Sequence, residues 1–273
     1  MRYYLISTYL FFVFCLFSCE EQTPLKTNSE TNAMLVVEGI ITNELDYFSI
    51  KLSNSVSNIN DTITPNSGAI VKIISAVNGN QNVQEINLVE DSQVKGKYNS
   101  PSQQRAVLNR DYTLQISYDG KIYTAKAIMI PISAINPVTY YSLSDTLSLY
   151  RINENFNSKE NAMFEITYDW DFNNDCDSCK AKAYYYSLNS IDVGQIFAPA
   201  KQNVKFPKGT VIIQKKYALS DSHADFIRQF LLETEWNGGY FDENPAPVAG
   251  NLSSGAVGYF GACMVLSDTL IVE

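Results

Sequence analysis

The chain has 273 residues, of which 45% are apolar and 18% are charged, so it can bury a substantial core and is not globally disordered. Its formal net charge is −9 and its isoelectric point is near 4.7. This acidity excludes a nucleic-acid partner, because phosphates would repel the surface, and it excludes adhesion to an anionic membrane through basic patches.

The first nineteen residues have the pattern of an export signal. Met1-Arg2 is a basic start, residues 3–17 are almost uninterruptedly apolar, and Ser18-Cys19 is followed by an acidic pair. The apolar run has the length and flanks of a secretory signal rather than of a membrane span. Leu16 to Cys19 resembles a bacterial lipobox, which predicts a signal peptide over 1–18 and acylation of Cys19. The alternative is an ordinary cleaved signal in which Cys19 is incidental.

Residues 19–32 are polar and contain Pro24, so we expect a tether. A run of short strands follows, and the segment 33–135 is predicted to form an antiparallel immunoglobulin-like or prealbumin-like β-sandwich. The clearest element is a hairpin from Tyr112 to Ala127, because Asp119-Gly120 suits a type I′ turn. The other expected strands cover 34–41, 48–52, 70–74, 85–89 and 96–98.

Pro131 and Pro137 flank an irregular stretch that we take as the boundary of a second, β-rich region over 136–273. One helix is expected at about 222–235, with Ser222 and Asp225 as a capping box and an apolar stripe of Phe226, Ile227, Phe230 and Leu231. Residues 256–266 are predicted to form one buried strand, with glycines where another backbone approaches closely. Further strands are expected over 164–170, 183–188, 210–213 and 268–273.

The cysteines after Cys19 are predicted to have structural roles rather than catalytic or metal-binding ones. Cys176 and Cys179 form a C-x-x-C whose aspartate neighbours disfavour a thiolate, so a local disulfide is the preferred interpretation over a redox or metal site. Cys263 lies in an apolar strand, where we expect it to behave as a small buried hydrophobe.

No catalytic residue or cofactor is predicted. Asp169, Asp171, Asn173, Asp175 and Asp177 alternate like calcium ligands, but the turn glycine and the bidentate glutamate of such a loop are missing, so no metal is assigned. His223 is expected to be solvated in the first helical turn. The sequence lacks a P-loop, a dinucleotide fingerprint, an H-E-x-x-H and a G-x-S-x-G elbow, and we therefore predict that the protein is not an enzyme.

Aromatic residues offer the best candidate for a binding surface. Trp236, Tyr240 and Phe241 follow the helix on a glycine-rich loop, and we expect them to form a ligand patch because such side chains are favoured at binding sites. The tyrosine-rich segments 140–141 and 184–186 are interpreted mainly as core and edge packing.

Three parts of the sequence resemble one family: Leu35-Val36-Val37-Glu38-Gly39, the Tyr112 hairpin, and the helix followed by Asn244-Pro245-x-Pro247-Val248 and Gly258-Tyr259-Phe260. The family is that of the Bacteroidota outer-membrane lipoproteins called domain of unknown function 4249. The resemblance covers essentially the whole mature chain and implies no catalytic residues. Glu20-Glu21 is similar to signals for the outer leaflet in such lipoproteins.

The resemblance implies a protein that is lipid-anchored in the outer membrane, on the cell-surface or the periplasmic leaflet. It also implies a binding or accessory role beside a TonB-dependent transporter. Two alternatives stay open: a structural or adhesive subunit of fimbrial type, and a surface hydrolase of glycan or peptide.

Overall fold

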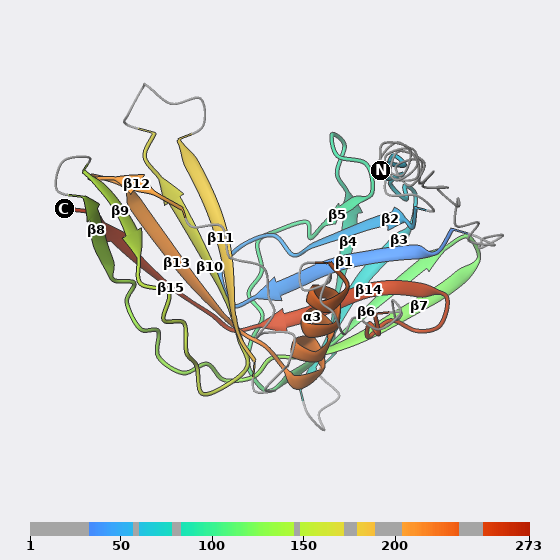
Figure 1. Ribbon diagram of the computed structural model, residues 1–273. Coiled ribbons are helices and arrows are strands. Elements are labelled where there is room, and N and C mark those ends of the chain that lie inside the picture. Colours follow the sequence, from blue (N-terminus) through green and yellow to red (C-terminus); the bar gives the residue numbers. More distant parts are fainter. Residues whose placement is uncertain are drawn as a thin grey trace, which may run out of the picture. The chain divides into compact units, whose positions relative to one another are not determined.

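The computed structural model describes residues 33–56, 60–77, 83–144, 148–171, 179–188, 204–234 and 248–273 (Figure 1). Residues 33–273 belong to one compact unit. The predicted signal peptide and tether, residues 1–32, lie outside the described residues. The fold is mostly β, as predicted, and the strands of the described residues fall into three sheets.

The largest sheet has eight strands, and all neighbouring strands in it are antiparallel except β14 and β1, which are parallel. Residues 251–253 precede the strand at one edge of this sheet, β14, and bond to the strand at the other edge, β7. Leu252 bridges to Ala125, and the Asn251 side chain donates to the Lys126 carbonyl. The strands in sheet order are β14 (Ala256–Cys263), β1 (Leu35–Thr42), β2 (Ser49–Asn54), β5 (Lys97–Asn99), β4 (Val83–Glu90), β3 (Ile70–Val77), β6 (Arg110–Tyr118) and β7 (Lys121–Ile128).

The alternation of side chains determines which face of this sheet is buried. In β6, Tyr112, Leu114 and Ile116 point into the core, while the residues between them are more exposed. The predicted turn at Asp119-Gly120 is confirmed, because both residues have positive φ angles, 49° and 70°.

A four-stranded antiparallel sheet and a three-stranded sheet share a second core, which includes Phe164, Ile166 and Ile212 from the first and Ile152 and Phe206 from the second. The four-stranded sheet has the order β11 (Lys180–Ser187), β10 (Ala162–Asp169), β13 (Val211–Ala218) and β15 (Val265–Ile271). The three-stranded sheet has the order β12 (Phe206–Pro207), β9 (Leu149–Ile152) and β8 (Tyr140–Ser144). The sequence analysis did not predict the strands of this smaller sheet, which are short and irregular.

The predicted single strand over 256–266 is wrong, because the chain changes sheets within it. β14 pairs with β1 as far as Cys263, and after Met264 the next strand, β15, pairs with β13. The Asn43 side chain holds the junction: its amide donates to the Val265 carbonyl at 3.1 Å, and its oxygen accepts from the Val265 N–H at 2.6 Å. A segment that the sequence assigned to the second region therefore completes the first sheet.

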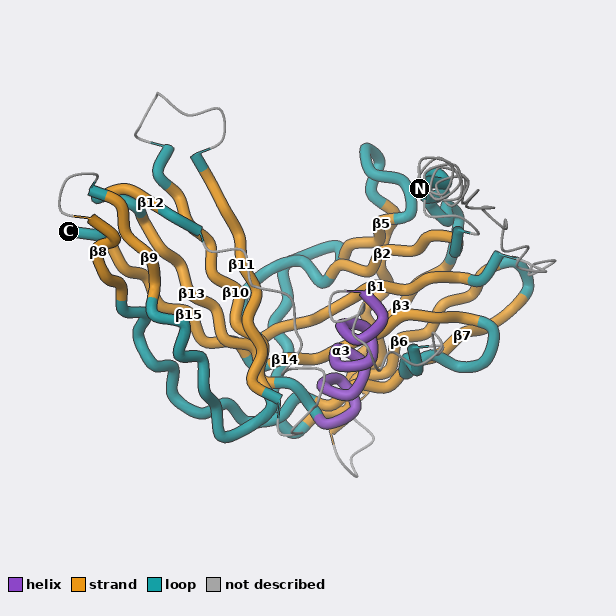
Figure 2. The backbone as a smooth tube through the Cα atoms, viewed as in Figure 1, coloured by secondary structure: helices purple, strands orange, loops and turns teal. Residues whose placement is uncertain are grey.

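Helix α3 (Asp221–Thr234) is the helix of the described chain, and it lies against β14 (Figures 1 and 2). Its predicted cap was misplaced: Ser220 is the N-cap residue, and its side chain accepts from the His223 N–H. Ser222 instead hydrogen-bonds to the Tyr259 hydroxyl at 2.9 Å. Of the predicted apolar stripe, Leu231 is buried but Phe230 is exposed.

The close approach of another backbone that was predicted for the glycines of β14 is confirmed at Gly258, whereas the neighbour of Gly261 is a side chain. A Cβ on Gly258, which has φ of +104°, would clash with the Val37 backbone. A Cβ on Gly261 would meet a side chain, the His223 ring, at 2.8 Å. The second contact places the only histidine of the chain against β14.

Candidate functional site

The outer face of the four-stranded sheet, on the side away from the second core, carries most of the accessible polar and aromatic side chains of that sheet. Cross-strand pairing arranges it in three rows. We define the outer face as Tyr184, Glu165, Lys215 and Ser267; Lys182, Thr167, Ile213 and Thr269; and Lys180, Asp169, Val211 and Ile271. Tyr184 is 45% exposed and Ile271 is 59% exposed, so apolar and aromatic surface is available between the charges.

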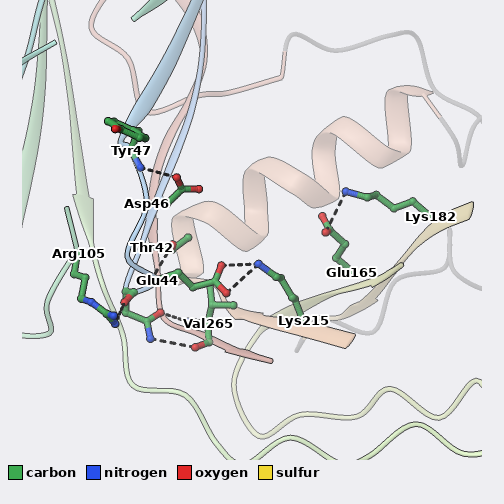
Figure 3. Close-up of polar contacts among 10 residues, drawn as sticks. Thr42, Glu44, Asp46, Tyr47, Arg105, Glu165, Lys182, Lys215 and Val265 are labelled. Carbon is green, nitrogen blue, oxygen red and sulfur yellow. Dashed lines mark hydrogen bonds and ion pairs between the residues drawn. The ribbon is translucent and has the colours of Figure 1, made fainter. Parts of the chain in front are cut away.

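The charges on this face are paired in opposite signs. Lys182 Nζ lies 3.1 Å from Glu165 Oε1, and Lys180 Nζ lies 3.1 Å from Asp169 Oδ2. Lys215 Nζ lies 2.7 Å from Oε2 of Glu44, a residue in the loop after β1. Figure 3 shows this pair beside the pair of Glu165 and Lys182. The pair of Lys180 and Asp169 is exposed, and the other two pairs are partly exposed. Ion pairs at the surface contribute little to stability, about 0.2–1 kcal/mol each, so a polar ligand can replace them.

The environment of the outer face raises the pKa of Lys182 and of Tyr184, which keeps the ammonium group charged and the phenol neutral. Partial burial alone would lower the pKa of Lys182, but the hydrogen bond and the charge of Glu165 raise it above its ordinary value. Burial, together with the Glu165 charge, raises the pKa of Tyr184, so its hydroxyl remains protonated. The outer face therefore offers ammonium groups, carboxylates and a phenol, and it suits binding by hydrogen bonds and stacking rather than proton transfer near neutral pH.

Glu44 also lies where the eight-stranded sheet contacts the four-stranded sheet. The side chain of the preceding residue, Asn43, bonds to Val265, and the Asn43 carbonyl accepts from Arg105 Nη1 at 3.2 Å. The contact of Glu44 with Lys215 joins the loop after β1 to β13, so one edge of the outer face is fixed to the first sheet (Figure 3).

A second cluster brings together His223 and Cys263, a pair that resembles a cysteine nucleophile and its general base. Cys263 Sγ lies 3.5 Å from His223 Nδ1, and the imidazole stacks on the Tyr259 ring with centroids 4.4 Å apart. Both side chains are buried, which corrects the expectation that His223 is solvated and confirms that Cys263 is a free, buried cysteine.

Burial removes the reactivity of this pair. It raises the pKa of the Cys263 thiol to about 12 and lowers the pKa of His223 to about 4. A catalytic cysteine needs a thiolate in an accessible, electropositive place, whereas this thiol and this imidazole are both neutral at pH 7. The pair therefore packs the helix onto β14 and is not suited to nucleophilic catalysis.

A third polar cluster fixes the segment between the two regions. Lys216 is 1% exposed, and its Nζ contacts Glu160 Oε1 at 2.9 Å and Ser133 Oγ at 2.7 Å. Burial alone would raise the pKa of Glu160, but the Lys216 ammonium and the Ser133 hydrogen bonds lower it to about 2. This ion pair attaches the irregular stretch around Pro131 to β13, so its role is structural.

Several predicted residues lie outside the described residues: Cys19, Cys176, Asn173, Asp175 and Asp177, and the aromatic patch of Trp236, Tyr240 and Phe241. Cys179 is disulfide-bonded, and its pairing with Cys176 stays a prediction. Asp169 and Asp171 both lie near Lys180, at 3.1 and 3.8 Å. In the part of the chain that the structure describes, no three histidine, cysteine or acidic side chains are grouped as a metal site.

The outer face and the two buried clusters were not found by the sequence analysis, because each depends on pairing between distant segments. The tyrosines of β11 were noted, and the structure divides them: Tyr184 is exposed, whereas Tyr185 is in the second core. The alternation in 164–170 could have identified Glu165, Thr167 and Asp169 as one outward row, but not their partners on β13 and β15.

No helix in the described ranges is long and apolar enough to cross a membrane. A search of curated proteins finds no match to this sequence. The family model for the domain of unknown function DUF4249 matches residues 20–269. This match extends over nearly the entire chain after Cys19, including both buried clusters and all of the outer face except Ile271, and the protein therefore belongs to the DUF4249 family.

Proposed function

We propose that this protein is an outer-membrane lipoprotein that acts as a binding component beside a TonB-dependent transporter. Residues 1–18 are removed as a signal peptide, Cys19 is acylated, and residues 20–32 tether the β-rich body to the lipid. The observation that carries this proposal is the sequence Leu16-Phe17-Ser18-Cys19 at the end of an apolar run too short to span a bilayer. A single acyl chain binds membranes reversibly, whereas two or more give stable anchoring.

Binding is favoured over catalysis by the chemistry of the described residues. The thiol and imidazole that lie together are buried and neutral, while the accessible charges of the outer face are arranged in mutually satisfied pairs. A partner with hydroxyl, amide or carboxylate groups could replace these weak ion pairs and stack on Tyr184. The outer face is therefore the surface that we assign to the ligand or partner.

Membership in the family supports the transporter as the partner, because the lipoproteins that this sequence resembles tend to be encoded beside such transporters. The acidic net charge supports a protein or small-molecule partner over nucleic acid.

The anchor is tested by mass spectrometry of the native, membrane-extracted protein. We expect a mature chain that begins at Cys19 and carries acyl mass, and a Cys19→Ser variant that is neither acylated nor retained in the membrane fraction. An unmodified thiol at Cys19, or a chain that begins elsewhere, would contradict the lipoprotein proposal.

The partner is tested by purifying the tagged full-length protein from detergent-solubilised outer membranes and identifying what accompanies it. We expect an outer-membrane barrel, with recovery reduced several-fold by Tyr184→Ala. Tyr141→Ala is the matched control, because Tyr141 is equally exposed, at 44%, but lies on β8. Recovery of no barrel, or equal losses with both variants, would count against the transporter role, and filaments in electron micrographs would favour the fimbrial alternative.

A further inference from the structure

The most exposed large apolar side chains of the described residues lie together at one end of the first sheet. They are Ile70, Val89 and Ile122, which are 69%, 63% and 63% exposed. Ile70 pairs with Ser117, and Ser117 pairs with Ile122, so two of them share one cross-strand row. The pairing of Val71 with Leu88 places Val89 next to Ile70 on the other side, so the three aliphatic side chains span β4, β3, β6 and β7.

The same end of the sheet receives the chain from its N-terminal segment. Leu35 at the start of β1 pairs with Asn54, and the Met34 carbonyl accepts from the Ser55 N–H. Further exposed apolar side chains lie in the neighbouring loops at this end; they are Met34, Val56, Ile63 and Val94. We call this rim, formed by residues 33–35, 54–56, 60–70, 89–97 and 117–122, the tether end.

Hydrogen bonds hold the loops of the tether end in fixed positions. Glu90 accepts from Gly96 N–H, Ser67 Oγ and Gly68 N–H, which joins two loops through one carboxylate. Tyr98 extends the network by donating from its hydroxyl to the Asn66 carbonyl at 2.9 Å. The aliphatic side chains are therefore presented from an ordered surface and do not require the loops to fold on contact.

We propose that the tether end rests on the lipid bilayer, with Ile70, Val89 and Ile122 entering the interface between headgroups and acyl chains. This inference depends on the proposed acylation of Cys19. Thirteen residues separate Cys19 from Ala33, and a chain of that length spans at most about 45 Å when fully extended. An anchor at Cys19 therefore keeps this end close to the membrane, and the high effective concentration makes a few aliphatic contacts sufficient.

Charge at the tether end indicates an apolar rather than an electrostatic contact. Three lysines, Lys95, Lys97 and Lys121, are outnumbered by four acidic residues, so no excess of basic groups faces anionic lipid; the acidic residues are Asp61, Glu90, Asp91 and Asp119. The contact is expected to be independent of the lipid headgroup charge and to persist in high salt, where electrostatic attraction is screened.

The test uses the full-length acylated protein in phosphatidylcholine vesicles, with single cysteines labelled by an environment-sensitive fluorophore. Ile122→Cys is compared with Ile128→Cys, which lies on the same outward face of β7 at its other end and is 47% exposed. Val89→Cys and Val83→Cys form a second matched pair on β4. The unsubstituted protein gives the background labelling.

We expect nitroxide-bearing lipids to quench the label at positions 122 and 89 several-fold more than at 128 and 83, with no change at about 1 M salt. Equal quenching within each pair, in protein that still floats with the vesicles, would overturn the lipid contact and leave the anchor intact. Failure to float would overturn the anchor and, with it, this inference. A spectral shift at 122 that depends on protein concentration and not on lipid would instead assign the surface to a second copy of the chain, which also overturns it.

Discussion

At the scale of single residues, burial decides what each reactive group can do. His223 and Cys263 are 40 positions apart in the sequence, and they meet because helix α3 packs on β14 where Gly261 leaves room for the imidazole. Lys216 is a strand residue whose cross-strand partners, Phe164 and Leu266, are apolar. It is tolerated in the interior because Glu160 and Ser133 satisfy its ammonium group. Both arrangements turn chemically versatile side chains into structural ones.

The first prediction concerns the Cys263 thiol. In the native protein we expect it to resist alkylation near pH 8, because burial raises its pKa and blocks access, and to react rapidly in denaturant. Mass spectrometry after timed iodoacetamide treatment measures this. Substantial modification under native conditions would show that the thiol is accessible and would reopen a catalytic interpretation of the pair.

Burial of His223 in this pair predicts that the stability of the protein depends on pH. His223 is neutral when folded, with a pKa of about 4, whereas an unfolded histidine titrates near 6.5. Between these values the unfolded state binds more protons, so the stability contributed by neutral His223 is present above pH 6.5 and is lost as pH falls towards 4. We expect a His223→Phe variant to lose less stability than the wild type between pH 7 and pH 4.5 in urea titrations. A parallel decline in both proteins would contradict this origin.

A further prediction concerns the buried ion pair. Lys216→Met leaves the Glu160 carboxylate without its cation, and we expect a loss of about 3 kcal/mol in the free energy of unfolding, as for other broken buried pairs. Lys182→Met removes the exposed partner of Glu165 and should cost at most about 1 kcal/mol. Urea denaturation measures both. Equal effects would mean that burial of Lys216 is not what makes its pair important.

At the scale of elements, the passage from β14 to β15 organises the fold. Two strands in different sheets are separated by Met264 alone, and the Asn43 side chain supplies the donor and acceptor that a neighbouring strand would otherwise provide to Val265. Buried backbone groups require such partners. Asn43 therefore fixes the point at which the chain changes sheets, and the neighbouring Glu44 joins the loop after β1 to β13.

The Asn43 contact can be separated into its two hydrogen bonds. Asn43→Ala removes both, and we expect it to cost about 2 kcal/mol, because the Val265 N–H and carbonyl lose their partner. Asn43→Asp keeps the acceptor for the N–H and should cost less. Denaturation midpoints and amide exchange at Val265 provide the measurement, and an unprotected Val265 amide in Asn43→Ala alone is the expected signature. Unchanged exchange would show that another group holds the junction.

At the scale of the whole molecule, the two regions described by the sequence are interleaved. The segment 256–263 crosses into the first sheet and pairs with β1, and residues 251–253 bond to β7 at the opposite edge of that sheet. The first sheet is therefore incomplete unless the C-terminal part of the chain is present. Exposed edges of this kind promote aggregation when left unpaired.

A fragment of residues 33–135 tests this interdependence. We expect it to aggregate or remain unfolded, because the pairing partners of β1 and β7 are missing, whereas residues 33–273 should unfold in one transition that circular dichroism and tryptophan fluorescence report together. A stable fragment with a cooperative transition of its own would show that the first region is an independent domain.

The sequence alone determined most of the local structure outside the three-stranded sheet, because alternation, turn chemistry and helical spacing are properties of neighbouring residues. It located the strands of the first sheet, the Asp119-Gly120 turn and helix α3 within a few residues, and it identified the family. Tertiary structure alone decided that residues 256–266 divide between two sheets, that His223 meets Cys263, that Lys216 is buried, and that Glu165, Lys182 and Tyr184 form one surface with β13 and β15. These features arise from pairing between strands far apart in the chain, and no local pattern encodes which distant strand will be the partner.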